Sequence, residues 1–328
     1  MGSKSRMQGK VSPDPNATRV YVGIDVCKEK LDVYLHPVGQ KLTVNNDANG
    51  IRRLKRLLKD HDVALVVMEA TGKLHRLAHR SLSASGFRVA IVNPLRSRLF
   101  AEAIGTLAKT DLVDARILAI FGESLNPAVS EPPSKLLESL QELVRGRQAA
   151  SDDRTALLNR LGASKNKCLV RELNRQLRTL DASIANLDVE IKLQIKGDPC
   201  LARRFEILVS IPGIGETTAA AIIVELQEIG TLSAKETAML GGLAPVACDS
   251  GETNGARHIR GGRWHLRNAL YMPAQSAARH NPDLKAFYDR LVAKGKEAMV
   301  ALTAVMRKLL ILANTLIRDD RLWQPNHA

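Results

Sequence analysis

The first 125 residues alternate between strand-like and helix-like hydrophobic patterns. Short runs that are β-branched or continuously apolar, typical of strands, cover residues 19–26, 30–36, 41–46, 63–68 and 88–92. Apolar residues at helical spacing cover residues 50–59, 74–83 and 112–123. The first three strand-like runs lie close enough together for an antiparallel meander, and the later runs alternate with helices. This order predicts an α/β domain with a mixed sheet flanked by helices.

A heptad pattern dominates the middle of the chain, after the Pro-rich residues 126–133, which mark the clearest domain boundary. Apolar residues at steps of four and three are Leu173, Leu177, Leu180, Ile184, Leu187 and Ile191. Leu136, Leu140 and Leu143 begin a similar stripe on an earlier helix. Such a seam predicts paired, coiled-coil helices. The sequence leaves open whether they form a hairpin within one chain or an arm that joins subunits.

The last part of the chain is predicted to be mainly helical. Residues 210–216 form a tight turn between two apolar helical runs, and the polar, Gly-rich residues 249–262 predict a loop. Helices follow from Trp264 and from Asp283, and the final, strongly apolar helix extends to about Arg318. The chain is thus divided into a flexible basic N-terminus, an α/β domain, a helical coiled-coil region and a helical C-terminal domain, at residues 1–18, 19–128, 129–204 and 205–328.

The composition favours a polyanionic partner. The 328 residues carry a formal net charge of +14, which favours binding to phosphates. Aromatic residues make up 3%, too few for base stacking to be the main mode of binding. Four scattered cysteines without a C-x-x-C pair indicate a reducing cytosol rather than disulfides or a zinc site. The polar N-terminus is no secretory signal, and Arg307 and Lys308 interrupt the longest apolar stretch, so no membrane partner is expected.

Four acidic residues suggest metal chemistry. Asp25 lies inside an apolar strand-like run and Glu69 directly follows another, where an ionised carboxylate is costly unless it is paired or binds a metal. Asp111 and Asp114 lie three residues apart on one face of a predicted helix start. Each acid alone has an ordinary explanation as a turn, loop or first-turn residue. Together they are compatible with a phosphoryl-transfer site that holds one or two Mg²⁺ ions.

A basic, Gly-rich stretch overlaps the predicted loop. Guanidinium groups suited to gripping phosphates belong to Arg257, Arg260, Arg263 and Arg267. In the turn at residues 210–216, Gly213 and Gly215 resemble those of a helix-hairpin-helix, whose backbone amides can hold a phosphate. A solvated basic loop and a plain interhelical turn would explain the same residues.

Several motifs resemble those of one family. In the first part of the chain they are residues 23–26 with 28–33, 68–72, 92–94 and 109–116, and in the last part residues 210–215, 242–245, 249–251 and 270–274. They follow one another in the expected order over about residues 19–320. The chain therefore resembles the insertion-sequence-110 family of DEDD transposases, also called bridge-RNA-guided recombinases.

The resemblance implies a fold and a catalytic apparatus. The family pairs an RNase H-like (RuvC-like) catalytic domain with a C-terminal transposase domain, expected here at residues 19–128 and 205–328. By position, the DEDD acids that bind Mg²⁺ would be Asp25, Glu69, Asp111 and Asp114. Ser250, which taken alone is most simply a turn residue, would be the nucleophile that forms a 5′-phosphoserine intermediate with DNA.

The resemblance also implies partners. They are a noncoding bridge RNA from the element, target and donor DNA, and three further copies of the chain in a tetramer, a dimer of dimers. The expected location is the prokaryotic cytoplasm, at the nucleoid. The leading hypothesis is thus an RNA-guided, site-specific DNA recombinase that serves transposition. The alternatives are a metal-dependent, structure-selective nuclease of the Holliday-junction-resolvase type and a non-catalytic nucleic-acid-binding protein.

Overall fold

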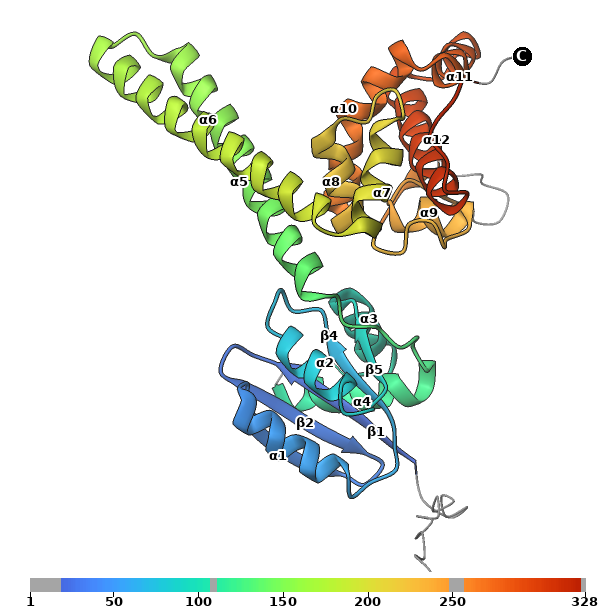
Figure 1. The fold of residues 1–328 in the computed structure, drawn as a ribbon. Coiled ribbons are helices and arrows are strands. Elements are labelled where there is room, and N and C mark those ends of the chain that lie inside the picture. Colours follow the sequence, from blue (N-terminus) through green and yellow to red (C-terminus); the bar gives the residue numbers. More distant parts are fainter. Residues whose placement is uncertain (1–18, 107–110, 248–256, 326–328) are drawn as a thin grey trace, which may run out of the picture. The chain divides into compact units, whose positions relative to one another are not determined.

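The computed structural model describes residues 19–106, 111–247 and 257–325 of the chain (Figure 1). The chain divides into two compact units, Met1–Pro133 and Ser134–Ala328. The first contains a mixed sheet with helices and the second is mostly helical, which confirms the fold class at that level. The expectation for the N-terminus, residues 1–18, lies outside the described residues.

The N-terminal unit is built on a five-stranded mixed sheet with the strand order β3-β2-β1-β4-β5. Strands β1 (Val20–Val26), β2 (Lys30–His36) and β3 (Gln40–Asn45) form the expected antiparallel meander. Strands β4 (Val63–Glu69) and β5 (Val89–Val92) extend the sheet in parallel on the other side of β1. All five strand-like runs of the sequence are therefore strands.

The two faces of the sheet are covered by different helices. Helices α1 (Ala48–Leu58) and α2 (Arg76–Ser83) share a core with the even-numbered residues of β1. Helix α4 (Asp111–Leu125) covers the opposite face, where its Leu118 and Phe121 pack against β4 and β5. Because side chains alternate along a strand, the odd-numbered residues of β1 point toward α4.

Gly23 lets α4 lie directly on β1. A Cβ atom at this position would collide with the backbone of α4 at Ala115 and Ala119. Only glycine permits so close an approach of a helix backbone to a strand. Asp25 is the next residue of β1 on the same face, and Ala115 directly follows Asp114, so this packing brings the first turn of α4 near the carboxyl end of β1.

Helix α3 (Pro94–Ala103) has no counterpart among the helices expected from the sequence. The Asn93 side chain accepts a hydrogen bond from the Leu95 amide and so caps the helix. Pro94 occupies the first turn, where its missing N–H costs no helical hydrogen bond. The same two residues therefore end β5 and start α3.

The C-terminal unit begins with a helical hairpin. Helices α5 (Lys135–Ala163) and α6 (Lys167–Lys196) pack along each other, with Leu173 and Leu177 in their buried seam. The interpretation as a hairpin within one chain thus holds for these helices. Leu140 belongs instead to the core of the helices that follow.

That core is formed by α7 (Pro199–Val209), α8 (Glu216–Glu225), α9 (Ala234–Leu240), α10 (Trp264–His280), α11 (Pro282–Ala293) and α12 (Ala298–Arg318). Strands β6 (Pro245–Val246) and β7 (His258–Ile259) form a short antiparallel ribbon, so the stretch predicted as a loop also contains a strand. Among the described residues, α12 alone is long and apolar enough to cross a membrane, yet half of its most apolar window is buried, as in a core helix.

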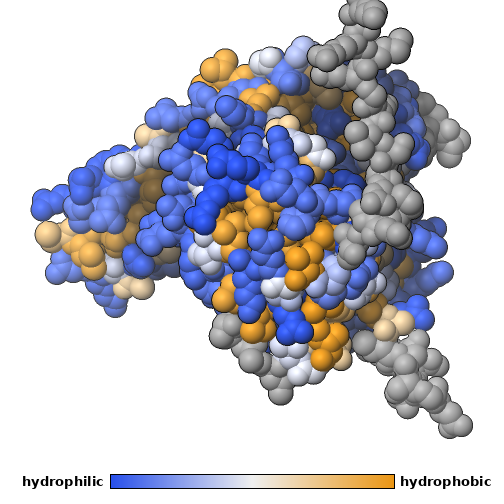
Figure 2. All heavy atoms as spheres, turned by 90° about the horizontal axis from the view of Figure 1, so that it is seen from below, coloured by the Kyte–Doolittle hydropathy of each residue, from blue (hydrophilic) through white to orange (hydrophobic). Residues whose placement is uncertain are grey.

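Several large apolar side chains of the N-terminal unit are exposed. They include Leu77, Leu95 and Leu99. Figure 2 shows apolar side chains gathered among hydrophilic ones on one face of the molecule. Leu95 and Leu99 stand one turn apart on α3, so they share a side of that helix. Ser97, between them in sequence, is buried.

Candidate active site in the N-terminal unit

The four acids singled out in the sequence line one cavity. Strands β1 and β4 are parallel neighbours, so Asp25 and Glu69, near their carboxyl ends, meet at the same edge of the sheet. Helix α4 begins at this edge, and its first turn adds Asp111 and Asp114. The cavity that all four line has a volume of about 500 Å³. Residues far apart in the sequence are therefore brought together by the order of the strands and the packing of α4.

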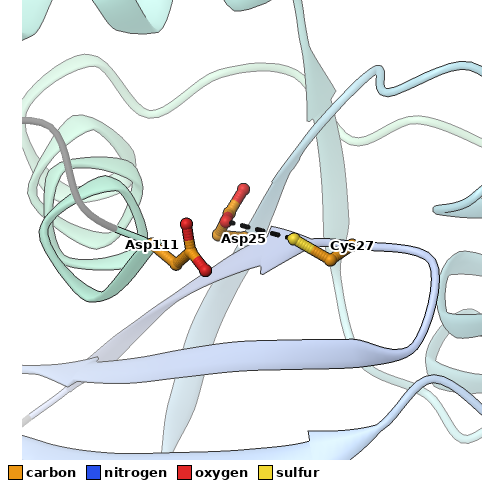
Figure 3. A group of neighbouring side chains, drawn as sticks. All are labelled: Asp25, Cys27 and Asp111. Atoms are coloured by element: carbon orange, nitrogen blue, oxygen red, sulfur yellow. Dashed lines mark hydrogen bonds between the residues drawn. The ribbon is translucent and has the colours of Figure 1, made fainter.

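The carboxylates of Asp25 and Asp111 lie close together, with the thiol of Cys27 beside them (Figure 3). One ligand atom from each of the three residues lies within 4.8 Å of the other two. Cys27 Sγ is 3.9 Å from Asp25 Oδ2. Burial raises the pKa of the Cys27 thiol, and the charges of Asp25 and Asp111 raise it further, so the group is protonated at neutral pH.

Glu69 is held by Ser97, a residue that sequence reasoning missed. Ser97 Oγ lies 2.6 Å from Glu69 Oε1 and 2.9 Å from the carbonyl oxygen of Pro94, either of which can accept its single proton. Ser97 is 2% exposed, so it fixes one carboxylate oxygen from inside the fold. The Asn-Pro start of α3 was the available clue, because an N-cap followed by proline is typical of a helix start.

The ammonium group of Lys30 contacts the acids. Its Nζ lies 2.7 Å from Asp111 Oδ2 and 2.9 Å from Asp32 Oδ2. The hydrogen bond to Asp111, and then the contact with Asp32, hold the pKa of Lys30 above its ordinary value, so the ammonium is charged. Sequence reasoning gave neither Lys30 nor Asp32 a role. Their spacing of two on a strand, which places both on one face, was the available clue.

The electrostatics of the cavity favour a bound cation. The pKa of Asp25 is raised to about 6, first by burial and then by the negative charges of Asp111, Asp114 and Glu69. Like charges at such proximity are costly, and a divalent ion would remove that cost. Carboxylate oxygens are ligands of hard divalent cations. The residues present therefore fit the divalent metal that the DEDD transposase family suggests.

Replacing Asp25 by Asn is expected to stabilise the metal-free protein near neutral pH but not in acid. The folded pKa of Asp25, about 6, lies above its ordinary value of 3.8, so the folded state binds more protons between these values. The contribution of Asp25 to stability therefore falls as the pH rises through this window. Thermal unfolding in EDTA measures the effect. The midpoint of Asp25→Asn should exceed that of the wild type at about pH 7.5, and the two should converge at about pH 4; equal midpoints at both would contradict the expectation.

Two of the arginines predicted to bind phosphates are engaged with the protein itself. Arg263 donates to both carboxylate oxygens of Glu228, at 2.7 and 2.6 Å. Arg267 donates to the carbonyl oxygens of Gly242 and Gly261, at 3.3 and 3.0 Å. These contacts fix the start of α10 against Glu228, which follows α8, and against Gly242, which follows α9. The other two predicted arginines, Arg257 and Arg260, are exposed.

The two glycines of the turn before α8 differ in their surroundings. Gly213 has a φ of +106°, and a Cβ there would lie 2.7 Å from the Cβ of Ala277 on α10. Backbone conformation and packing therefore account for this glycine. Gly215 is exposed, with open space around it, at the N-cap of α8. Ser250 lies outside the described residues, so its role stays a prediction.

Comparison with known proteins identifies relatives over nearly the whole chain. Residues 22–164 match a DEDD family described as transposase, and residues 205–289 match the family described as transposase IS116/IS110/IS902. The chain is 32% identical over 317 residues to the pilin gene-inverting protein of Moraxella bovis, which covers 93% of this chain and 97% of the relative.

The protein of the same name from Moraxella lacunata is also 32% identical over 317 residues, with the same coverage of both chains. An uncharacterized 43.6 kDa protein of the insertion element IS110 from Streptomyces coelicolor is 27% identical over 178 residues, 53% of this chain and 42% of the relative. Since both family matches and the full-length relatives agree with the DEDD cavity, the chain belongs to the IS110 family of transposases, which are enzymes of the DNA recombinase type.

Proposed function

We propose that this transposase is an RNA-guided, site-specific recombinase that cuts and rejoins target and donor DNA for an insertion sequence. The observation that carries the proposal is the convergence of four carboxylates on one cavity, where burial and then the charges of the other three acids raise the pKa of Asp25 to about 6. Such a site suits metal-dependent phosphoryl transfer.

The architecture of the N-terminal unit supports a RuvC-like domain. The strand order β3-β2-β1-β4-β5, with β2 antiparallel to β1, agrees with the RNase H fold that the family resemblance implies. The acids stand at the carboxyl ends of its parallel strands and on the helix that covers them. We therefore assign the catalytic domain to residues 19–128, the coiled-coil region to residues 129–204 and the transposase domain to residues 205–328.

The four acids would hold Mg²⁺, as one ion or two. A hard divalent cation there would lower the pKa of an attacking hydroxyl and neutralise charge on the phosphate that is transferred. The chain itself positions the ligands, since Ser97 holds one oxygen of Glu69 and Lys30 holds one oxygen of Asp111. An all-carboxylate set favours Mg²⁺ over softer metals.

We assign the nucleophile to Ser250 on the family resemblance. Its Oγ would bond to phosphorus as the P–O3′ bond breaks, which leaves a 5′-phosphoserine on the protein and a 3′ hydroxyl on the DNA. Attack by a 3′ hydroxyl of the partner DNA would then release the serine and rejoin the strand. The name of the Moraxella relatives, gene-inverting protein, supports recombination over simple cleavage, because inversion requires rejoining.

The proposed partners are a bridge RNA, target and donor DNA, and other copies of the chain in a tetramer. A net charge of +14 suits contacts with phosphate backbones, while base pairing by the RNA would choose the sequence. Arg257 and Arg260, whose side chains are exposed, are proposed as phosphate contacts.

A reconstituted reaction tests this function. The full chain is combined with the noncoding RNA of its element, target DNA, donor DNA and MgCl₂, and joined products are scored. Joined products are expected only when both RNA and Mg²⁺ are present, and scrambling the target-pairing loop of the RNA should abolish them. Products formed without RNA would refute RNA guidance, and cleavage without joining would favour a nuclease.

A further inference from the structure

A fifth acid, Asp32, lies beside the four of the cavity. It is the direct partner of Asp25 in the β1–β2 ladder, and its side chain is 4% exposed. Thr43 Oγ1, on β3, donates to Asp32 Oδ1 at 2.6 Å. A carboxylate so deeply buried is costly unless an opposite charge accompanies it.

Lys30 supplies that charge and links Asp32 to the candidate site. Its Nζ lies 2.9 Å from Asp32 Oδ2 on one side and 2.7 Å from Asp111 Oδ2 on the other. Lys30 thus connects the buried Asp32 of β2 to Asp111, the first residue of α4. The Asp111 side chain is 49% exposed, so burial alone leaves it several rotamers. The bond from Lys30 selects one of them.

Lys30 acts through Asp111 rather than on a substrate. The described residues that line the cavity include Asp111 but not Lys30. Stability alone does not explain the pair either, because an ion pair with one solvent-exposed partner contributes little to the free energy of unfolding. Charged partners outside the ligand shell are instead typical of metal sites, where they orient the ligands.

We infer that Asp32 and Lys30 are positioning residues that hold the Asp111 carboxylate in the orientation in which it binds the divalent cation. The inference rests on the proposed metal site and assigns the pair a part in assembling it. Asp32 anchors Lys30, and Lys30 orients Asp111.

Calorimetric titration of the full chain with MgCl₂ and with MnCl₂ tests the inference without any DNA. Lys30→Met and Asp32→Asn should each weaken metal binding, which means a dissociation constant raised about tenfold or more. The double variant should be hardly weaker than either single one, because both act on the same ligand. Lys41→Met, which removes an exposed lysine from β3, is the matched control and should bind as the wild type does.

Unchanged dissociation constants in Lys30→Met would overturn the inference. Tighter binding would overturn it as well, since it would identify Lys30 as a competitor of the cation for Asp111. Thermal unfolding checks that Asp32→Asn is folded; if it is not, Lys30→Met, whose side chain is 44% exposed, carries the test alone. Asp25→Asn distinguishes failure of the inference from failure of the proposed metal site. If this variant still binds the ions normally, the proposed metal site itself is refuted.

Discussion

Replacing Asp111 by Asn is expected to reduce DNA strand cleavage by on the order of 10³-fold or more. The substitution keeps the shape of the side chain but removes the charge that would bind the cation, and it leaves Lys30 with a neutral partner. Glu69→Gln should have a similar effect, although Ser97 can still donate to the amide oxygen. Cleavage of labelled DNA in the reconstituted reaction measures both.

Glu123→Gln is the matched control for this pair. Glu123 lies on the same helix as Asp111 but pairs with His36 on β2, at 3.0 Å, outside the residues that line the cavity. The Glu123→Gln variant should cleave DNA at the rate of the wild type. All three variants should still bind DNA and RNA, since none of the residues belongs to the basic stretch. Normal cleavage by Asp111→Asn and Glu69→Gln would refute the catalytic role of these two acids. No cleavage by the wild type itself would leave a non-catalytic binding protein as the better account.

Replacing Ser250 by Ala is expected to abolish the covalent protein–DNA adduct and to lower recombination by on the order of 10⁴-fold or more. Without the hydroxyl there is no oxygen to form the phosphoserine. The phosphodiester bond of the DNA is then not exchanged for a covalent ester on the protein, from which the strand could be rejoined. A denaturing gel of labelled DNA and protein measures the adduct, and joined products measure recombination. Metal binding should be unaffected, because the four acids belong to the N-terminal unit.

The neighbouring hydroxyl of Thr253 provides the control for Ser250. Thr253→Ala removes an oxygen three residues away in the sequence and should leave adduct and product formation intact. If Ser250→Ala cleaves DNA at the normal rate, water must be the nucleophile. That result would replace the recombinase by a nuclease of the resolvase type.

The strands of the sheet and the candidate acids could be predicted from the sequence because both leave a local signal in the pattern of apolar and polar residues. Apolar alternation marks the strands, and a carboxylate such as Asp25 within such a run contradicts its surroundings. The parallel neighbours β1 and β4 then bring Glu69 to the same edge. The strands and the anomalous acids need no knowledge of long-range packing, whereas the pairing of β1 with β4 joins distant segments.

The supporting residues could not be predicted in this way because their roles depend on contacts between distant segments. Lys30 and Asp111 are 81 residues apart, and only the packing of α4 on the sheet joins them. The same holds for Arg263, whose charge suggested a phosphate although Glu228 lies within reach in the fold. Composition reveals that a cation is present but not which anion it meets.

The contact at Gly23 has a consequence for the spacing of the cavity. No side chain of β1 separates the strand that carries Asp25 from the backbone of α4, the helix that carries Asp111 and Asp114. Any larger residue would act as a wedge and move the two halves of the ligand set apart. The span of the site is therefore vulnerable to the addition of a single methyl group at Gly23.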